Sequence, residues 1–112
     1  MALETVKRNL VRRVVGAFRD YAASQGWRPE DYRIYVWPNL DWFSVHVILA
    51  VKSLPERNAE DSTFAAIDFV HDKLKDDPDL ARSIGLTVRT FDQIEQGGLY
   101  GIAPDFVEAD DL

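Results

Sequence analysis

Two histidines, His46 and His71, are the side chains of this 112-residue sequence whose chemistry is best suited to proton transfer near neutral pH. The sequence has no cysteine, which excludes thiolate nucleophiles, redox pairs and cysteine-held zinc. His71 precedes Asp72, but a metal site on this pair would need further histidines that the sequence lacks. We therefore expect His71 to be a hydrogen-bonded residue at the margin of the core. His46 is expected on a strand, half-exposed, where it could orient a ligand.

Aspartates recur along one predicted helix at spacings of seven, four and four residues, which places Asp61, Asp68, Asp72 and Asp76 on one stripe. Asp68 and Asp72 lie one turn apart, and their oxygens could hold a hard cation weakly. No loop of closely spaced acidic residues ending in a bidentate glutamate accompanies them. We expect a solvated acidic face that pairs with a basic stripe on the N-terminal helix or on a neighbouring molecule, and we predict no metal site.

A glycine-rich segment spans residues 97–101. A phosphate-binding loop would be followed by a helix and by Lys-Ser/Thr, and neither follows here. We expect turns in an irregular tail that begins near residue 96 and docks in part. No nucleophile elbow, His-Glu-x-x-His segment or recognisable Ser/His/Asp arrangement is present, so we predict no catalytic residues and no cofactor.

Aromatic residues mark a predicted β-hairpin, with strands over 32–37 and 42–52 around a turn at 38–41. The simplest closure pairs Trp37 with Trp42, Tyr35 with Ser44, and Arg33 with His46. These residues share one face with Ile48 and Ala50, whereas the alternate, apolar positions form the core side. A wet aromatic face would invite aggregation. We expect it to be covered by a second copy, a different protein, a flat ligand or the chain's own residues 99–107.

Further elements follow from hydrophobic spacing. Apolar residues recur every three or four positions over 3–25, which predicts a helix that ends at Gly26. The same reasoning predicts a helix over 62–76 with Phe64 and Val70 in its buried arc, a short helical turn over 79–83 capped by Asp79, and a strand over 86–94. No repeat or linker is visible, so residues 1–112 are expected to form one domain.

The resulting fold class is α+β, a two-layer sandwich in the order helix, strand, strand, helix, short helix, strand. Both helices are expected on one face of a sheet of three strands, or four if the tail adds one. This order resembles that of the type II KH-like folds, in which a Gly-x-x-Gly turn between paired helices grips RNA. Residues 76–79 read Asp-Asp-Pro-Asp at that place and would repel phosphate. The resemblance implies a fold only. The predicted fold also resembles that of small acidic secretion chaperones, which place helices over a twisted sheet and dimerise.

The charge of the chain is uneven. Its net charge is −6, with +3 over residues 1–33 and −9 over residues 34–112. The overall charge repels phosphate backbones and anionic lipid, which argues against nucleic acid and membrane as partners. No signal peptide or membrane span is predicted, and we expect a cytoplasmic protein. A basic face on the first helix stays open as a local exception, formed by Arg8, Arg12 and Arg19.

Three functions follow from these features. The leading hypothesis is a non-enzymatic interaction or adaptor protein that forms a homodimer through the aromatic outer face of its hairpin. The second is a small-molecule-binding or hydrolytic domain with a pocket between this face and the glycine-rich tail, using His46, Arg33 and Tyr35. The third is nucleic-acid binding by the basic face of the first helix. The predicted interface residues are Trp37, Trp42, Tyr35, Arg33, His46 and Ile48.

Overall fold

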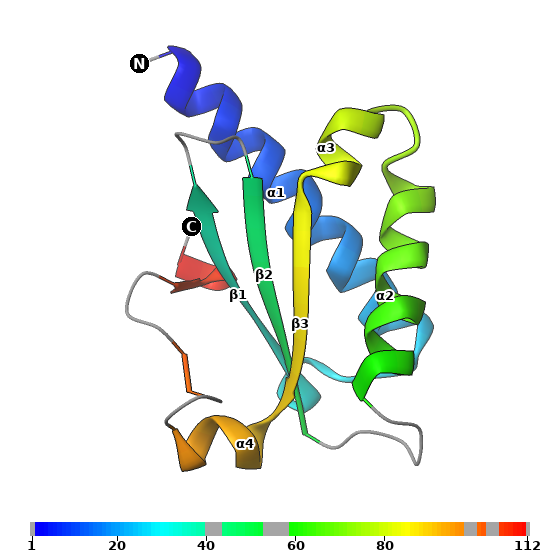
Figure 1. Cartoon of the computed structure of the whole chain (residues 1–112), viewed down its shortest axis with the longest axis vertical. Helices are drawn as coiled ribbons and strands as arrows, with labels where there is room; N and C mark the ends of the chain where they lie inside the picture. Colours follow the sequence, from blue (N-terminus) through cyan, green and yellow to red (C-terminus); the bar gives the residue numbers. More distant parts are fainter. Residues whose placement is uncertain (1, 40–43, 53–58, 98–100, 103–105, 112) are drawn as a thin grey trace.

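The computed structural model describes residues 2–39, 44–52, 59–97, 101–102 and 106–111. Its elements follow the chain in the order shown in Figure 1. The helices are α1 (Ala2–Ser24), α2 (Ala59–Lys73), α3 (Pro78–Arg82) and α4 (Phe91–Gln96), with short 3-10 helices at η1 (Pro29–Asp31) and η3 (Ala109–Asp111). The strands are β1 (Tyr32–Asn39), β2 (Ser44–Val51), β3 (Ile84–Thr90) and β4 (Val107–Glu108).

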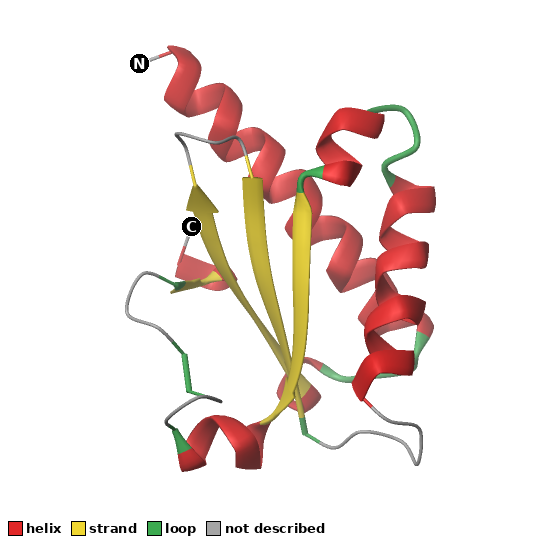
Figure 2. Ribbon diagram, viewed as in Figure 1, coloured by secondary structure: helices red, strands yellow, loops and turns green. Residues whose placement is uncertain are grey.

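The molecule is a two-layer α+β sandwich, which confirms the predicted fold class. The described strands form one mixed sheet in the order β3-β2-β1-β4. β1 pairs antiparallel with β2 and with β4, and β2 pairs parallel with β3. A parallel pair requires a crossover connection, and α2 and α3 supply it. Figure 2 shows α1 crossing behind the strands and α2 standing beside β3. Buried residues of both helices and of the strands form one core, so one sheet face, here called the inner face, is covered by the two long helices.

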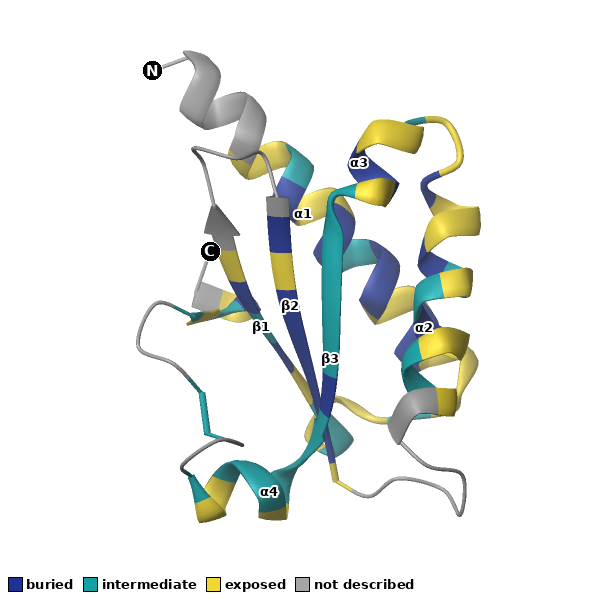
Figure 3. Ribbon diagram, viewed as in Figure 1, coloured by how far each residue is buried: buried dark blue, intermediate teal, exposed yellow. Residues whose placement is uncertain are grey.

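The core lies between the inner face and these two helices. Alternate strand residues point into it, because successive side chains of a strand point to opposite faces. Figure 3 shows buried surfaces along the sides of α1 and α2 that face the sheet. The largest fully buried side chains are Phe18, Leu49, Leu80, Val14, Val36, Val47, Val51 and Val70.

The predicted hairpin exists, but its predicted register is wrong by four residues. Trp37 lies opposite His46 rather than Trp42, Tyr35 opposite Ile48, and Arg33 opposite Ala50. The cause is that β1 continues through Pro38 and Asn39. Proline is tolerated there because this end of β1 extends past its pairing with β4, which involves only residues 35 and 36. The displacement is an even number of residues, so every side chain keeps its predicted face.

Several boundaries also differ from the sequence expectation. α3 is capped by Asp77, whose Oδ1 accepts from the Leu80 N–H at 3.2 Å, and not by Asp79. The third strand ends at Thr90 because α4 starts at the next residue. The Thr90 hydroxyl accepts from the Gln93 N–H, and the Gln93 side chain accepts from the Thr90 N–H, which closes a capping box.

The buried arc of α2 is rotated from the predicted one. Ala66, Val70 and Leu74 are buried at four-residue intervals. This row leaves Phe64 58% exposed and also exposes His71, seven residues further on the same side of the helix. The predictions that Phe64 is buried and that His71 lies at the core margin are therefore wrong. Within the described residues, no helix is both long and apolar enough to cross a membrane.

Candidate functional site

The outer face of the sheet, opposite α1 and α2, carries most of the predicted site residues. Directly paired residues project to the same side, so the register of β1, β2, β3 and β4 arranges them in transverse rows. The first row is Gly85, His46 and Trp37; the second is Thr87, Ile48, Tyr35 and Glu108; the third is Arg89, Ala50 and Arg33.

The first row is a stack of rings that rests on a glycine. The ring centroids of His46 and Trp37 are 5.5 Å apart at an interplanar angle of 31°. On the other side of His46, a Cβ added to Gly85 would lie 3.2 Å from the His46 Nδ1 atom. The imidazole therefore occupies the space that a side chain at residue 85 would need. Phe106, from the C-terminal segment, packs against Trp37 with a centroid distance of 5.9 Å.

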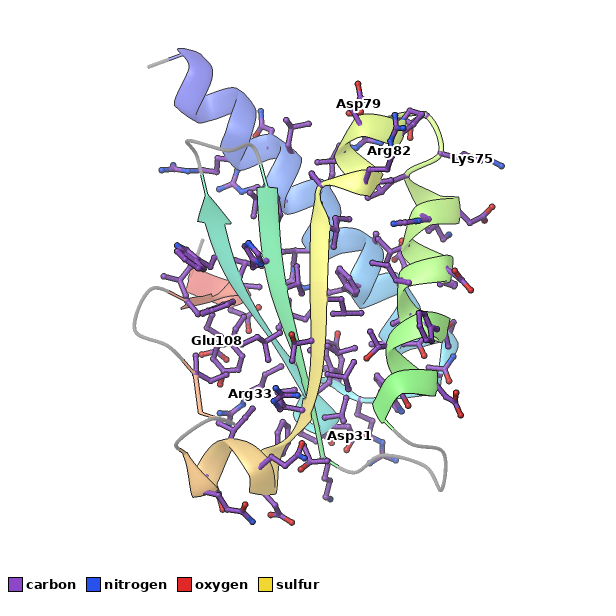
Figure 4. All side chains as sticks on the ribbon, viewed as in Figure 1. Asp31, Arg33, Lys75, Asp79, Arg82 and Glu108 are labelled. Atoms are coloured by element: carbon purple, nitrogen blue, oxygen red, sulfur yellow. The ribbon has the colours of Figure 1, made fainter. Side chains whose placement is uncertain are left out.

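The third row carries two arginines on either side of the fully buried Ala50. The Arg33 guanidinium carbon lies 5.7 Å from the centre of the Phe91 ring of α4, which is a cation–π contact. A hydrogen bond with Tyr35 and the electrostatic attraction of Tyr35 and Glu108 raise the pKa of Arg33. Arg33 and Glu108 are labelled in Figure 4, where both lie on the C-terminal-segment side of β1. The Arg33 guanidinium is thus held in place by groups of the same chain.

Residues from the C-terminal part of the chain cover parts of this face, since Phe106 packs against Trp37 and Phe91 lies against Arg33. Ile48 is 9% exposed and Ala50 is fully buried although neither points toward the long helices. Figure 1 shows α4 beyond the lower end of the strands and β4 beside β1, at the edge of the sheet opposite α2. Trp37 stays 38% exposed at the rim. The predicted interface residue Trp42 lies outside the described residues, and so do residues 98–100 of the tail.

A hollow of about 240 Å³ opens between this cover and the edge strand β3. Its polar lining groups are the side chains of His46, Thr87 and Arg89, and Phe106 forms an apolar wall. Gly85 and Gly101 line it without adding side chains. The hollow therefore lies where the second hypothesis expected a pocket, between the sheet face and the tail. Arg33 and Tyr35, which that hypothesis named with His46, are not among the lining residues.

A larger hollow of about 400 Å³ follows the open edge of β1 beside β4. The charged residues that line it are already paired in the structure. Arg19 Nη2 donates to Asp110 Oδ1 at 2.6 Å, and Glu108 attracts Arg33. The opposite charges that line this hollow therefore neutralise one another.

The charged faces of the helices pair in a way that the sequence did not predict. Arg13 Nη2 donates to both carboxylate oxygens of Asp76 at 2.9 Å, and Arg13 Nη1 lies 3.9 Å from Asp77. Arg13 thus joins α1 to the turn before α3. The predicted stripe partners Arg8, Arg12 and Arg19 are exposed, and Asp110 lies in a hollow lined by Arg12 and Arg19. An acidic residue therefore interrupts the predicted basic face.

Among the described residues, no group of three or more histidine or acidic side chains is placed to hold a metal ion. Asp68 and Asp72 are exposed on α2. Gly97, at the start of the glycine-rich segment, has a φ of 70° and ends α4, with its N–H donating to the Ile94 carbonyl. The described part of this segment thus serves turn formation, as expected.

Several lining residues of the hollow were not predicted as site residues, among them Gly85, Thr87, Arg89 and Phe106. The alternation of Gly85, Thr87 and Arg89 on one side of β3 was a usable signal, since alternate residues share a face. What the sequence did not indicate is that β3 lies parallel beside β2.

Comparisons with protein-family models, with curated proteins and with solved structures found no match.

Proposed function

We propose that this protein is a non-enzymatic binding domain that takes a small molecule into the hollow lined by His46, Thr87, Arg89 and Phe106. The observation that carries the proposal is the hollow itself. Ligand sites are concave and combine apolar walls with a few convergent polar groups, and this hollow has both. It also lies between strands β2 and β3 on one side and the described residues Gly101 and Phe106 on the other.

The groups in the hollow suit binding better than acid–base catalysis. A catalytic histidine is commonly oriented by a carboxylate, and none of the described residues that line this hollow is acidic. His46 instead lies between Trp37 and Gly85, and its ring packs against Trp37. A ring placed in this way can donate a hydrogen bond to a bound molecule.

The experiment is a screen of fragments with fewer than about twelve non-hydrogen atoms, because larger ligands exceed the volume of the hollow. Binding is followed on ¹⁵N-labelled protein. We expect the amide resonances of Gly85, Thr87, Arg89 and Gly101 to shift together. Shifts confined to other parts of the chain would contradict the proposal.

Two substitutions at one position serve as test and control. Thr87→Phe places a ring in the hollow and should abolish fragment binding. Thr87→Val removes the hydroxyl but keeps the shape of the side chain, so the hollow stays open and fragments that depend on its shape should still bind. Equal binding to both variants would show that the hollow is not the site.

A second candidate, self-association through the rim of the outer face, is supported by the exposure of Trp37. Among the described residues, the large exposed hydrophobic side chains are Trp37, Phe64 and Val107. Tryptophan is enriched among residues that dominate protein interfaces. Analytical ultracentrifugation of Trp37→Ser and of the control Phe64→Ser tests this candidate. Loss of a dimer in the first variant alone would support it, and a monomeric parent protein at all concentrations would exclude it.

A further inference from the structure

We infer that this protein forms a homodimer in which the edge strand β3 pairs with β3 of a second copy and the two α2 helices pack over the junction through Phe64 and Ile67. The inference goes beyond the proposed function and does not depend on the hollow. It rests on the exposure of β3, on the apolar side chains beside it, and on the register that two copies of β3 can adopt.

The strand β3 is accessible along the edge of the sheet. It pairs with β2 and, among the described residues, with no other strand. Of its seven residues only Val88 is buried. An edge strand presents N–H and C=O groups that a further strand can pair with, and proteins commonly block such an edge with proline, a bulge or several charges. The register of β3 with β2 is unbroken, and its sequence holds no proline and a single charge, Arg89.

Apolar side chains of α2 lie beside this edge. Phe69 of α2 packs against Tyr21 of α1, with ring centroids 5.5 Å apart. At about 100° per residue, Phe64 and Ile67 lie about 140° and 160° around the helix from Phe69, and therefore on the side away from α1. Figure 1 shows α2 alongside β3, at the edge of the sheet. Phe64 is 58% exposed there, and Ile67 is half-buried against the core.

Two copies of β3 can pair along their whole length. Antiparallel pairing of identical strands has a two-fold axis perpendicular to the sheet, so both α2 helices lie on the same side of the joined sheet. Directly opposite residues project to the same face. A register centred on Thr87 keeps inner-face residues opposite inner-face residues and uses all seven residues of β3.

This register is self-complementary. On the inner face, Leu86 of each copy lies opposite Val88 of the other, which extends the apolar layer under the α2 helices. On the outer face, Gly85 lies opposite Arg89 of the second copy, so the smallest residue of β3 faces the largest. The two Arg89 residues are offset by four residues, about 14 Å along the strands, which exceeds the screening length of about 8 Å at physiological ionic strength. The edge thus fits a second copy of itself in shape and in charge.

The first test is sedimentation equilibrium of the full-length protein. Phe64→Glu places an unpaired charge at the contact between the α2 helices, and we expect it to raise the dissociation constant of the dimer at least about tenfold. The matched control is Ala65→Glu, which adds the same charge to the next exposed residue, on the side of α2 that Phe69 occupies. We expect the control to keep the dissociation constant of the parent protein within about twofold.

The second test reads the register. Because the chain has no cysteine, a single introduced cysteine can form a disulfide only with a second copy. Thr87 lies on the two-fold axis, where opposite Cα atoms are about 4.5–5.5 Å apart, within reach of a disulfide. Arg89→Cys lies on the same face but about 14 Å from its counterpart. We expect Thr87→Cys to cross-link at least about tenfold faster than Arg89→Cys on mild oxidation.

Three results would overturn the inference: a parent protein that stays monomeric up to about 1 mM, a folded Phe64→Glu variant that dimerises as the parent does, or equal cross-linking rates for the two cysteine variants. A dimer that Trp37→Ser abolishes and Phe64→Ser retains would place the contact at the rim of the outer face instead. None of these measurements involves a ligand, so the proposed function is tested separately by the fragment screen.

Discussion

The inner and outer faces of the sheet are made by the same strands, but they differ in composition and in the chain segments that pack against them. On the inner face, Ile34, Val36, Val47 and Leu49 are apolar and buried. The alternate residues project to the other side and include the charged or titratable groups Arg33, Tyr35 and His46. One strand pair therefore provides a hydrophobic layer and a polar surface at once, because its side chains alternate.

The covers differ in length as well as in chemistry. Helices of 23 and 15 residues lie over the inner face, whereas the described contacts on the outer face come from Phe91 of the six-residue α4 and from Phe106. Regions with short elements and few buried apolar side chains open at lower free energy than the core does. We therefore expect the inner face to account for most of the stability and the outer face, where the proposed ligand binds, to account for less.

Two neighbouring residues of β2 test this difference most directly. Leu49 is 1% exposed on the inner face, and Ile48 is 9% exposed on the outer face. We expect Leu49→Ala to lower the free energy of unfolding by about 2–5 kcal/mol, and Ile48→Ala to lower it by less, because the cover of the outer face can relax into the space. Urea unfolding followed by circular dichroism gives both values. Equal losses of unfolding free energy would show that the residues around Ile48 relax no more than those around Leu49.

The pH dependence of the unfolding free energy tests the inner layer through its titratable residue Tyr21. Burial raises the pKa of Tyr21 above the ordinary value of 10.0, so the folded state disfavours its anion. The stability that this residue contributes is complete below pH 10 and is lost as pH rises through the raised pKa. Tyr21→Phe should make the alkaline fall of unfolding free energy shallower by up to about 1.4 kcal/mol per pH unit in that window. Parallel curves for the two proteins would contradict the assignment.

The sequence was sufficient to predict the layers and the sidedness of the sheet. Sidedness depends only on whether a residue number is odd or even along a strand, so Trp37, Tyr35 and His46 were assigned to the correct face even though the register was displaced. The helix α1 was also predicted to within one residue at each end, since Gly26, with a φ of 75°, marks its end.

The sequence was insufficient where a site depends on distant segments. Arg89 reaches the hollow because β3 lies parallel beside β2, and Phe106 reaches it from the position just before β4, at the opposite edge of the sheet. Neither arrangement has a local signal. The end of β3 did have a local signal, since Thr90 and Gln93 have the spacing of a capping box. The apolar alternation before Thr90, however, also fitted a longer strand.

The smallest expected change in unfolding free energy is that of a substitution at Gly85, which lies on the outer face and lines the hollow. Gly85→Ala puts a Cβ 3.2 Å from His46 Nδ1, so the imidazole must move by a few tenths of an ångström. His46 is exposed and can move, and alanine is better suited than glycine to a strand, so we expect unfolding free energy to change by less than about 0.5 kcal/mol. The indole N–H resonance of Trp37, which stacks on His46, should shift.

The control is Gly16→Ala on α1. A Cβ there meets nothing within 4 Å, so the substitution should stabilise the helix by about 0.5–1 kcal/mol and leave the Trp37 resonance unchanged. A Trp37 resonance that responded to neither substitution would mean that His46 does not transmit changes from β3 to the rim of the outer face.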